Sequence, residues 1–394
     1  MKETRFKQTE IGLIPEDWEV LYLYNISQNA MYGVGASAVK YDGINKYIRI
    51  TDINDTNGCF EPMPLVSPEW FLDKYIVKEN DILIARTGAS VGKCYLYKQS
   101  DGKLIFAGFL MRLNIINADS KFTFYQLCTK YYKNWIASES ARTGQPGVNL
   151  QQIKSFGIPS PQSMREQNKI ASALTSIDNL LLSIDKLIEK KRLIKQGAMQ
   201  ELLTGKKRLP GFTGEWVERQ VKDLGSIGRG RVISQKEIER SYQHKYPVYS
   251  SQTQNNGVMG YIDTYDLEGE YITWTTDGVN AGTVFHRNGL FNCTNVCGTI
   301  KLHKDNHLFV SMRLGLETNN YVSTNLANPK LMNNVMKQIV IDLPETIEEQ
   351  RAIATVLSSM DKEIESLEGK KAKYEQIKQG MMQQLLTGKI RLIS

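Results

Sequence analysis

The chain contains an internal duplication, and this feature restricts its possible folds more than any other. Residues 165–209 and 348–392 align without a gap at an offset of 183 residues, with 22 identities in 45 positions. The register extends upstream, where each half has a proline and an isoleucine at matching positions: Pro146, Ile158 and Pro161 correspond to Pro329, Ile341 and Pro344. Self-similarity of this kind is typical of a duplicated structural unit. The chain therefore consists of two halves that end in the same segment.

Each half also opens with a related tryptophan segment, GLIPEDWEV around Trp18 and GFTGEWV around Trp216. The distance from the tryptophan to the shared glutamine is 149 residues in the first half, up to Gln167, and 134 in the second, up to Gln350. Two similar frames thus hold two regions that differ in length and sequence. We expect four segments: a first globular domain over 1–163, a central helix over 164–205, a second globular domain over 206–346 and a carboxy-terminal helix over 347–394.

The repeated segments are predicted to be long helices that pack on another helix. Ser163-x-x-Glu166 and Thr346-x-x-Glu349 have the spacing of capping boxes, and Gly205 is placed to end the first helix. Gly388 is placed to end the second. A helix from 166 to 203 would be about 57 Å long. Apolar residues recur at alternating steps of four and three, as in a coiled-coil seam: Ile170, Leu174, Ile177, Leu181, Ile184 and Ile188, then Ile353, Leu357, Met360, Ile364 and Leu367.

The last turns of the two segments are nearly identical, IKQGAMQELLTG and IKQGMMQQLLTG. Gly197 and Gly380 lie inside the predicted helices, where each costs about 1 kcal/mol relative to alanine. A repeated cost of this kind indicates the close approach of another helix. Two interpretations remain: a coiled coil within the chain, or one that also docks partner helices. The docking candidates are Ile194, Gly197, Met199, Leu202, Leu203, Ile377, Gly380, Met382, Leu385 and Leu386.

The two variable regions are predicted to be mixed α/β domains. Short β-branched and aromatic runs, separated by Gly, Asn and Asp, indicate strands. In the first region these are 47–50, 81–85, 95–97 and 104–106, and in the second 246–249, 271–275, 283–285 and 296–302. Helices are expected at 122–137 and 308–315.

The charge distribution is compatible with a nucleic-acid partner but does not require one. The chain has 49 Lys and Arg against 42 Asp and Glu, a net charge of +7. Residues 165–209 carry ten basic and five acidic residues, whereas 1–164 and 210–347 have net charges of +2 and −1. The basic stripe could follow a polyanion or be a solvated helix face. A strong non-specific affinity for DNA is not expected from nearly neutral domains.

The sequence predicts a cytoplasmic protein with no membrane partner. No apolar run approaches the roughly 18 residues that span a bilayer, and the start, MKETRFKQTE, lacks the apolar stretch of a signal peptide. Five cysteines form an odd and sparse set that argues against a disulfide framework.

Two motifs invite a chemical interpretation, and neither fits it. Gly88-Ala-Ser-Val-Gly92-Lys93 is similar to a phosphate-binding loop, but three residues separate the glycines instead of four. A partial counterpart, 276–282, follows a strand in the second region, and a glycine turn at a domain surface explains both. Such a turn could contact a DNA backbone or groove. Cys293, Cys297, His303 and His307 are zinc-ligand types, but the linker between the pairs is too short. We expect no metal site.

No catalytic constellation emerges, so the sequence predicts a binding protein and not an enzyme. All four histidines lie in the second variable region, and no glycine-rich cofactor loop follows an amino-terminal strand. Arginine reads guanine, and asparagine or glutamine reads adenine, in the major groove of DNA. Taken singly, such residues are more often ordinary surface residues than base readers. The candidate DNA-binding residues are Arg49, Arg86, Thr87, Ser90, Lys93, Arg142, Gln145, Arg229, Arg231, Tyr249, Gln252, Asn256, Thr275, Thr276 and Asn280.

Together, the helix with EQ near its start, the duplicated IKQG-x-M-Q-x-LLTG-K-x-RL ending and the GLIPEDWEV opening resemble one family over the full chain. This family is the DNA-specificity subunit of type I restriction–modification systems. The phrases DILIARTGASVG and YPVYSSQTQNNGVMGYID also resemble its target-recognition domains. The resemblance implies two target-recognition domains of mixed α/β fold, separated by two long antiparallel coiled-coil helices with pseudo-twofold symmetry.

The resemblance also implies a function. Each target-recognition domain would read one half of a bipartite site on double-stranded DNA, and the helices would set the unread spacer. Two methyltransferase subunits would dock on the helices and methylate adenine N6 with S-adenosylmethionine, and restriction and motor subunits would add ATP- and Mg²⁺-dependent cleavage. The chain itself would bind no cofactor. The alternatives are a coiled-coil scaffold that never reads DNA and a self-sufficient modifying enzyme, which the missing motifs disfavour.

Overall fold

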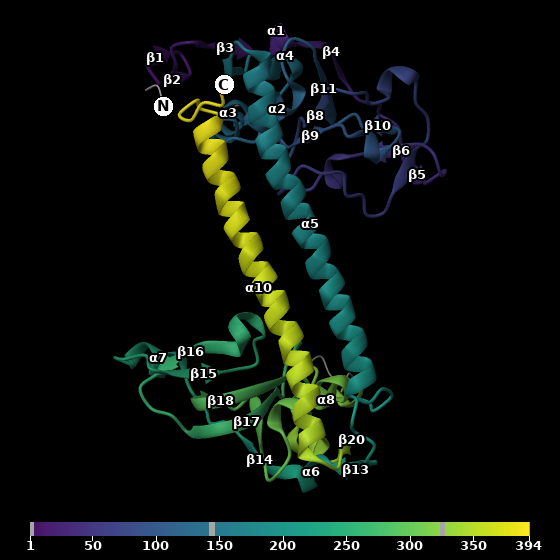
Figure 1. The fold of residues 1–394 in the computed structure, drawn as a ribbon, viewed down its shortest axis with the longest axis vertical. Coiled ribbons are helices and arrows are strands. Elements are labelled where there is room, and N and C mark those ends of the chain that lie inside the picture. Colours follow the sequence, from purple (N-terminus) through teal and green to yellow (C-terminus); the bar gives the residue numbers. More distant parts are fainter. Residues whose placement is uncertain (1–3, 142–145, 324–327, 394) are drawn as a thin grey trace. The chain divides into compact units, whose positions relative to one another are not determined.

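The computed structural model describes residues 4–141, 146–323 and 328–393. The chain forms two units, one comprising residues up to Lys186 together with those from Gly369 onwards, the other Leu187–Glu368. Two 39-residue helices, α5 (Met164–Leu202) and α10 (Ile347–Leu385), each contribute one end to each unit. Figure 1 shows both helices as continuous ribbons. No helix among the described residues is long and apolar enough to cross a membrane.

The first unit contains a four-stranded antiparallel sheet in the order β4-β11-β8-β9 and several strand pairs around it. Helix α2 packs on β8 and β9, and the parallel pair β10·β6 lies in a separate small sheet. The elements are β1 (Phe6–Thr9), β2 (Gly12–Pro15), β3 (Trp18–Tyr22), α1 (Leu23–Ile26), β4 (Ser27–Tyr32), β5 (Ala38–Lys40), β6 (Lys46–Ile48), β7 (Val66–Pro68), β8 (Asp81–Ala85), β9 (Cys94–Leu96), β10 (Leu104–Phe106), β11 (Leu110–Ile115), α2 (Ser120–Gln126), α3 (Lys130–Ser140), α4 (Leu150–Lys154) and β12 (Gly157–Pro161).

The second unit contains a six-stranded sheet in the order β14-β19-β17-β18-β15-β16, antiparallel except between β15 and β18. Helix α8 covers β17 and β18. The elements are β13 (Trp216–Gln220), α6 (Val221–Leu224), β14 (Gly225–Arg229), α7 (Gln235–Arg240), β15 (Tyr246–Tyr249), β16 (Val258–Ile262), β17 (Leu267–Thr275), β18 (Val284–Cys293), β19 (Cys297–Leu302), α8 (His307–Glu317), α9 (Asn333–Met336) and β20 (Val340–Pro344).

Each unit has the same frame. The tryptophan strand pairs in antiparallel register with the strand that precedes the long helix, so that Trp18 lies opposite Pro161 and Trp216 opposite Pro344. In each frame a one-turn helix, α1 or α6, then leads into the first strand of the sheet. The mixed α/β fold and the duplicated frame therefore confirm the sequence-based expectation.

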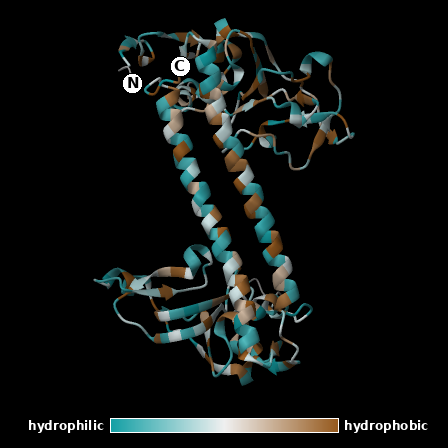
Figure 2. Cartoon of the chain, viewed as in Figure 1, coloured by the Kyte–Doolittle hydropathy of each residue, from teal (hydrophilic) through white to brown (hydrophobic). Residues whose placement is uncertain are grey.

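The predicted seam of the long helices is also confirmed. Ile170, Leu174 and Ile184 are buried in α5, and Ile353 and Leu357 in α10. Figure 2 shows hydrophobic and hydrophilic residues alternating along both helices, as an amphipathic pattern requires. In the second unit Lys191 pairs with Glu363 and Lys195 with Asp361, and in the first Asp178 pairs with Lys378 and Asp185 with Lys371. In each unit the helix segments are therefore antiparallel.

The ends of the helices differ partly from the sequence prediction. Gly205 and Gly388 take φ values of 69° and 67° directly after the helices, as predicted for their role as caps. The predicted capping boxes were wrong, because the carboxylates of Glu166 and Glu349 accept hydrogen bonds from arginines instead. The predicted helix over 122–137 is two helices, because the Thr129 side chain accepts a hydrogen bond from the backbone N–H of Tyr132 and starts a new helix.

Candidate nucleic-acid interface

Both globular domains are fastened to the long helices through the glutamine that the repeat shares. The Gln167 side chain accepts a 2.9 Å hydrogen bond from the backbone N–H of the residue that caps α2, and donates one of 3.0 Å to the last carbonyl of β12. Gln350 makes the same two bonds, of 2.8 and 3.1 Å, with the cap of α8 and the last carbonyl of β20. Both amides are buried. Each long helix therefore holds one helix, α2 or α8, and the last strand of its domain in one fixed arrangement.

An arginine clamp repeats in the same way. Arg391 donates two hydrogen bonds of 2.7 and 2.8 Å to Glu166 and two of 2.6 Å to Asp17. Arg208 donates two of 2.6 and 2.7 Å to Glu349. The buried glutamates compensate the guanidinium charges, and Arg391 lowers the pKa of the Asp17 carboxyl. The end of one long helix is thereby tied to the start of the other.

A glycine loop follows a sheet strand in both domains, at residues 86–92 and 276–282. Gly88 and Gly278 have φ values of 75° and 97°, and Gly92 and Gly282 values of 80° and 88°, all in the left-handed region that favours glycine. The fifth residue of each loop, Ser90 in the first and Asn280 in the second, accepts a hydrogen bond on its carbonyl from the backbone N–H three residues on. The partial counterpart that the sequence indicated is therefore the same turn.

Each glycine loop is also anchored by the same bonds to a later segment. Gly88 N–H donates to the Pro146 carbonyl at 3.0 Å, and Gly278 N–H donates to the Pro329 carbonyl at 3.0 Å. These prolines correspond to one another at the offset of the repeat. The loops therefore belong to the duplicated frame, although the regions around them are unlike in sequence.

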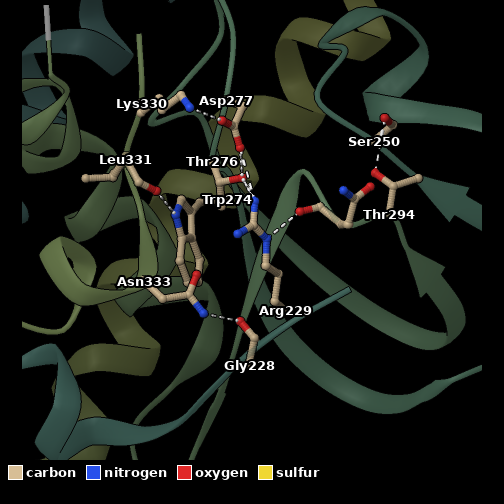
Figure 3. A network of polar contacts seen from close by, with 11 residues as sticks. Gly228, Arg229, Ser250, Trp274, Thr276, Asp277, Thr294, Lys330, Leu331 and Asn333 are labelled. Atoms are coloured by element: carbon tan, nitrogen blue, oxygen red, sulfur yellow. Dashed lines mark hydrogen bonds and ion pairs between the residues drawn. The ribbon is translucent and has the colours of Figure 1, made fainter. Parts of the chain in front are cut away.

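In the second domain, the base of the loop carries a network of polar contacts (Figure 3). Arg229 Nη2 donates to Asp277 Oδ2 at 3.1 Å and to Thr276 Oγ1 at 3.2 Å. Thr276 Oγ1 donates to Asp277 Oδ2 at 2.7 Å, and Lys330 Nζ lies 3.6 Å from Asp277 Oδ1. Arg229 also donates to the carbonyl of Asn295. The Asp277 carboxylate thus contacts two cations, Arg229 and Lys330, at the base of the glycine loop.

In the first domain, the glycine loop begins with Arg86, at the position that Thr276 takes in the second. Its guanidinium lies 4.9 Å from the centre of the Tyr32 ring, a cation–π contact. Its Nε is buried without a hydrogen-bond partner, and the described residues place no carboxylate in an ion pair with it. The Tyr32 hydroxyl accepts a hydrogen bond from the backbone N–H of Leu150. This cation is therefore held by an aromatic ring, and no carboxylate of the described residues pairs with it.

The remaining candidates in the first domain are less suited to DNA. Arg49 donates two hydrogen bonds to Asp52, at 2.8 and 2.7 Å. Lys93 points into the fold, where it donates to the Ile53 carbonyl at 3.0 Å. Thr87 and Ser90 lie on the glycine loop and are half-buried. Two further candidates, Arg142 and Gln145, lie outside the described residues.

The other candidates of the second domain divide into exposed and buried residues. Arg231 is held by Glu237 and Asp266, at 2.6 and 2.8 Å, and lowers the pKa of the Glu237 carboxyl. Thr275 and Thr276 are buried in the strand and loop. The loop between β15 and β16 contributes Gln252 and Asn256, both exposed, and Tyr249 and Asn280 are half-buried nearby.

The Asn280 amide donates to the Ser251 carbonyl at 3.2 Å, which joins the β15–β16 loop to the glycine loop. Behind them lies the buried Arg287, whose guanidinium stacks 3.7 Å from the centre of the Tyr249 ring. Burial lowers the pKa of this arginine. The two loops of the second domain are therefore joined by a hydrogen bond, and a buried arginine supports Tyr249 beside them.

The candidate docking residues at the ends of the long helices occupy two environments. Leu202 and Leu203 are buried in the core of the second unit, and Leu385 and Leu386 in the core of the first. Met199 and Met382 pack partly against the same cores. Ile194 and Ile377 are exposed, and Cβ atoms built on Gly197 and Gly380 meet nothing within 4 Å. Within the described chain, no helix approaches these glycines, and only the exposed members offer surface to a partner.

The residues considered for zinc do not form a metal site. Among the described residues, no three His, Cys, Asp or Glu side chains are grouped to hold a metal ion. Cys293 and Cys297 are buried and free; the three other cysteines are also free, with Cys94 buried and Cys59 and Cys128 partly buried. His286 and His307 flank Glu270 instead, at 3.6 and 3.4 Å, and burial lowers the pKa of both imidazoles.

Four residues that organise the site were not singled out as functional from the sequence: Gln167, Gln350, Arg208 and Arg391. The signal was available, because each pair is identical at the offset of the repeat. Polar residues retained in both copies of a helix end are expected to make the same contact twice.

Comparison with known proteins agrees with this architecture. The family described as "Type I restriction modification DNA specificity domain" matches residues 15–195 and 213–376. Each match covers one variable region and most of the long helix that follows it. The two matches together account for most of the chain.

Individual relatives are specificity subunits. A type I restriction enzyme MjaX specificity subunit of Methanocaldococcus jannaschii is 26% identical over 442 aligned positions, covering 99% of this chain and 98% of that protein. The MpnII specificity subunit of Mycoplasma pneumoniae is 41% identical over 145 residues, 36% of this chain and 43% of that protein. The chain thus matches less than half the length of the second relative.

Solved structures agree in fold. The type I restriction–modification S subunit of M. genitalium superposes with a TM-score of 0.65 at 16% identity, covering 93% of this chain and 96% of that one. A chain from a study of complex assembly and conformational transition in the type I R-M system gives 0.59 at 14% identity, covering 96% and 99%. With two family domains on a duplicated frame, the chain belongs to the type I restriction–modification DNA specificity family, as a specificity subunit and not a catalytic one.

Proposed function

We propose that each target-recognition domain reads one half of a bipartite sequence on double-stranded DNA. The observation that carries this proposal is that the two halves share the contacts to the long helices but differ in the sheets between them. The glutamine joints, arginine clamps and glycine loops are the same in both halves, whereas one domain has a four-stranded sheet and the other a six-stranded sheet. Identical frames with different inserts suit two different sequences presented to the same partners.

The proposal extends to the long helices, which would set the unread spacer between the half-sites. A helix rises about 1.5 Å per residue, so seven residues inserted into both helices would add about 10.5 Å and keep the heptad seam in register. Since DNA rises about 3.4 Å per base pair, the spacer should grow by about three base pairs. An unchanged spacer would show that the helices do not measure it.

We further propose that two methyltransferase subunits dock on the helices, because the repeat offers the same surface twice, as a symmetric pair of partners requires. The exposed Ile194 and Ile377 are the first residues to test. S-adenosylmethionine would be used by these partners for adenine N6 methylation. ATP and Mg²⁺ would be used by restriction and motor subunits, with no cofactor bound by this chain.

The decisive experiment is co-expression of the chain with a methyltransferase subunit, followed by sequencing of methylated bases in the host DNA. A bipartite motif with N6-methyladenine on opposite strands of its two halves is the expected result. A stable complex that adds no methylation would favour a scaffold that does not read DNA.

An exchange of inserts then tests the assignment of half-sites. Residues 15–160 are replaced by the corresponding insert of a specificity subunit with another motif, which leaves helices α5 and α10 unchanged. One half of the methylated sequence should change and the other half should persist. A change in both halves would contradict the model of two independent readers.

A further inference from the structure

The backbone around the two glycine loops is alike over a wider region than the loops themselves. At the end of the first sheet strand, Gly33 N–H donates to the Leu110 carbonyl and Gly230 N–H to the Cys297 carbonyl, both at 3.0 Å. A Cβ atom on either glycine would lie 2.2 Å from a backbone carbonyl oxygen, so no side chain fits at either position. The strand end and the glycine loop therefore form a junction that the two domains share, although the sheets around it differ.

Each junction holds an arginine. It comes from the glycine loop in the first domain and from the end of the strand in the second. The residue before Gly33 is Tyr32, and the first residue of its loop is Arg86; the ring and the guanidinium are 4.9 Å apart. The residue before Gly230 is Arg229, which lies 3.2 Å from Thr276 in the corresponding loop position. The two domains thus place an arginine at the same junction from different positions in the sequence.

Packing within the domain explains the glycines on the inner side of each loop, but it does not explain the exposed residues at the tip. A Cβ atom on Gly92 would lie 2.8 Å from Ile136, and one on Gly282 would lie 2.8 Å from Val322, so these glycines permit close packing. The outer residues Ala89 and Val279 are exposed, the latter to 90%. At each exposed tip, the backbone N–H groups of two described residues, 89 and 90 or 279 and 280, have no backbone hydrogen-bond acceptor and are available to a ligand.

We propose that these two junctions, each a glycine loop with one guanidinium, bind the sugar–phosphate backbone of DNA without reading its sequence. The inference rests on the proposed function, in which the two domains read different sequences. A geometry shared by two such domains suits the feature that both half-sites share, which is the backbone. The planar guanidinium fork matches phosphate oxygens, and backbone N–H groups of the loop can approach them.

The two junctions are not equally strong. At the loop position after the first residue, the first domain has Thr87 and the second has Asp277. Asp277 accepts from Arg229 and lies 3.6 Å from Lys330, so it neutralises the cations that would meet a phosphate. The first junction therefore contributes more to the affinity for DNA, and Asp277 lowers the contribution of the second.

Salt dependence of DNA binding tests the phosphate contact. The full chain, in complex with a methyltransferase subunit, is titrated with a duplex that carries its methylated motif at several salt concentrations. Because each phosphate contact adds about 0.9 to the slope of log K against log salt, Arg86→Gln should reduce the slope by about 0.9 and weaken binding about eightfold at 0.1 M salt. Arg86→Lys should restore most of the slope.

Two further variants serve as controls for this measurement. Lys130→Gln removes the same charge from an exposed position at the start of α3 and should leave the slope unchanged. Asp277→Asn should have the opposite effect to Arg86→Gln, with tighter binding and a steeper slope. Equal slopes for Arg86→Gln, Asp277→Asn and the parent complex would overturn the proposal.

A loop exchange separates backbone contact from base reading. The tips are swapped by Ala89→Val with Ser90→Asn in the first domain and by Val279→Ala with Asn280→Ser in the second. The methylated motif should be unchanged, since the loops read no bases; an altered half-site would refute the inference while leaving the two-reader function intact. If the parent complex methylates no bipartite motif, the proposed function itself fails.

Discussion

The two target-recognition domains differ in their sheets but join the long helices in the same way. The first domain spreads its strands over a four-stranded sheet and several separate pairs, whereas the second gathers six strands into one sheet. Both nevertheless use the same glutamine joint, the same arginine–glutamate clamp and the same glycine loop. The difference teaches that one frame holds two unlike inserts that end in these contacts, so the sheet can vary while the attachment stays fixed.

The arginine clamps should give the largest effects, and they test whether the two attachments are equivalent. Arg391→Ala leaves the buried Glu166 without its cation, which should lower the free energy of unfolding by about 3–5 kcal/mol. Arg208→Ala should lower it less, because the Arg208 side chain is 26% exposed against 10% for Arg391. Denaturant unfolding followed by hydrogen exchange in each unit measures both. Asp17→Asn is the control, because its 61% exposed carboxylate should contribute at most about 1 kcal/mol.

The glycines that end the long helices should rank next. Both lie in the left-handed region, where a side chain costs roughly 1–2 kcal/mol. A Cβ atom on Gly388 would also lie 2.4 Å from Pro15, whereas one on Gly205 comes no closer than 3.1 Å to Trp216. Gly388→Ala should therefore destabilise the first unit more than Gly205→Ala destabilises the second. Equal losses in thermal unfolding would mean that Pro15 moves aside.

The glycines inside the helices separate intramolecular packing from partner docking. Because nothing lies within 4 Å of a Cβ atom on Gly197 or Gly380, alanine at either position should stabilise the chain by about 1 kcal/mol. If a methyltransferase helix packs there, the same substitutions should weaken assembly, which size-exclusion chromatography of mixed subunits would reveal. Stabilisation with unimpaired assembly would place the docking surface elsewhere.

The sequence predicted the frame well because the frame is local and repeated. The heptad periodicity and the capping glycines located both long helices, and the offset of the repeat matched the two halves, although α5 ends at Leu202 and α10 at Leu385, short of the expected ends at 205 and 394. The strand prediction over 104–106 agrees with β10 and that over 246–249 with β15. These features depend on neighbours along the chain, which a sequence displays directly.

The candidate site was less predictable because it depends on distant contacts. Arg49 and Lys93 look alike in the sequence, yet the first is bound by Asp52 and the second donates to a carbonyl forty residues away. Leu202 and Leu203 have the pattern of a docking surface, and a core that buries the same apolar area produces the same pattern. Hydrophobicity identifies surfaces that are buried, but it does not identify what buries them.

Acid sensitivity should give the smallest effect and the cleanest distinction between the halves, because all four histidines lie in the second domain. Burial lowers the pKa of His286 and His307, so the folded state binds fewer protons than the unfolded chain, whose imidazole pKa is about 6.5. Their contribution to stability is therefore present above that pH and is lost as the pH falls. Between pH 7.5 and 6 the unfolding temperature of the second unit should drop by about 1–3 °C.

The same change of pH should leave the first unit unaltered, which hydrogen exchange resolved by unit can measure. His286→Gln should remove part of the sensitivity, and the exposed His303→Gln serves as its matched control. Because Glu270 lies between His286 and His307 and favours their charged forms, Glu270→Gln should lower both pKa values further. If the first unit lost as much stability as the second, the response would have to come from groups other than the histidines. The two domains would then not differ in the pH dependence of their stability.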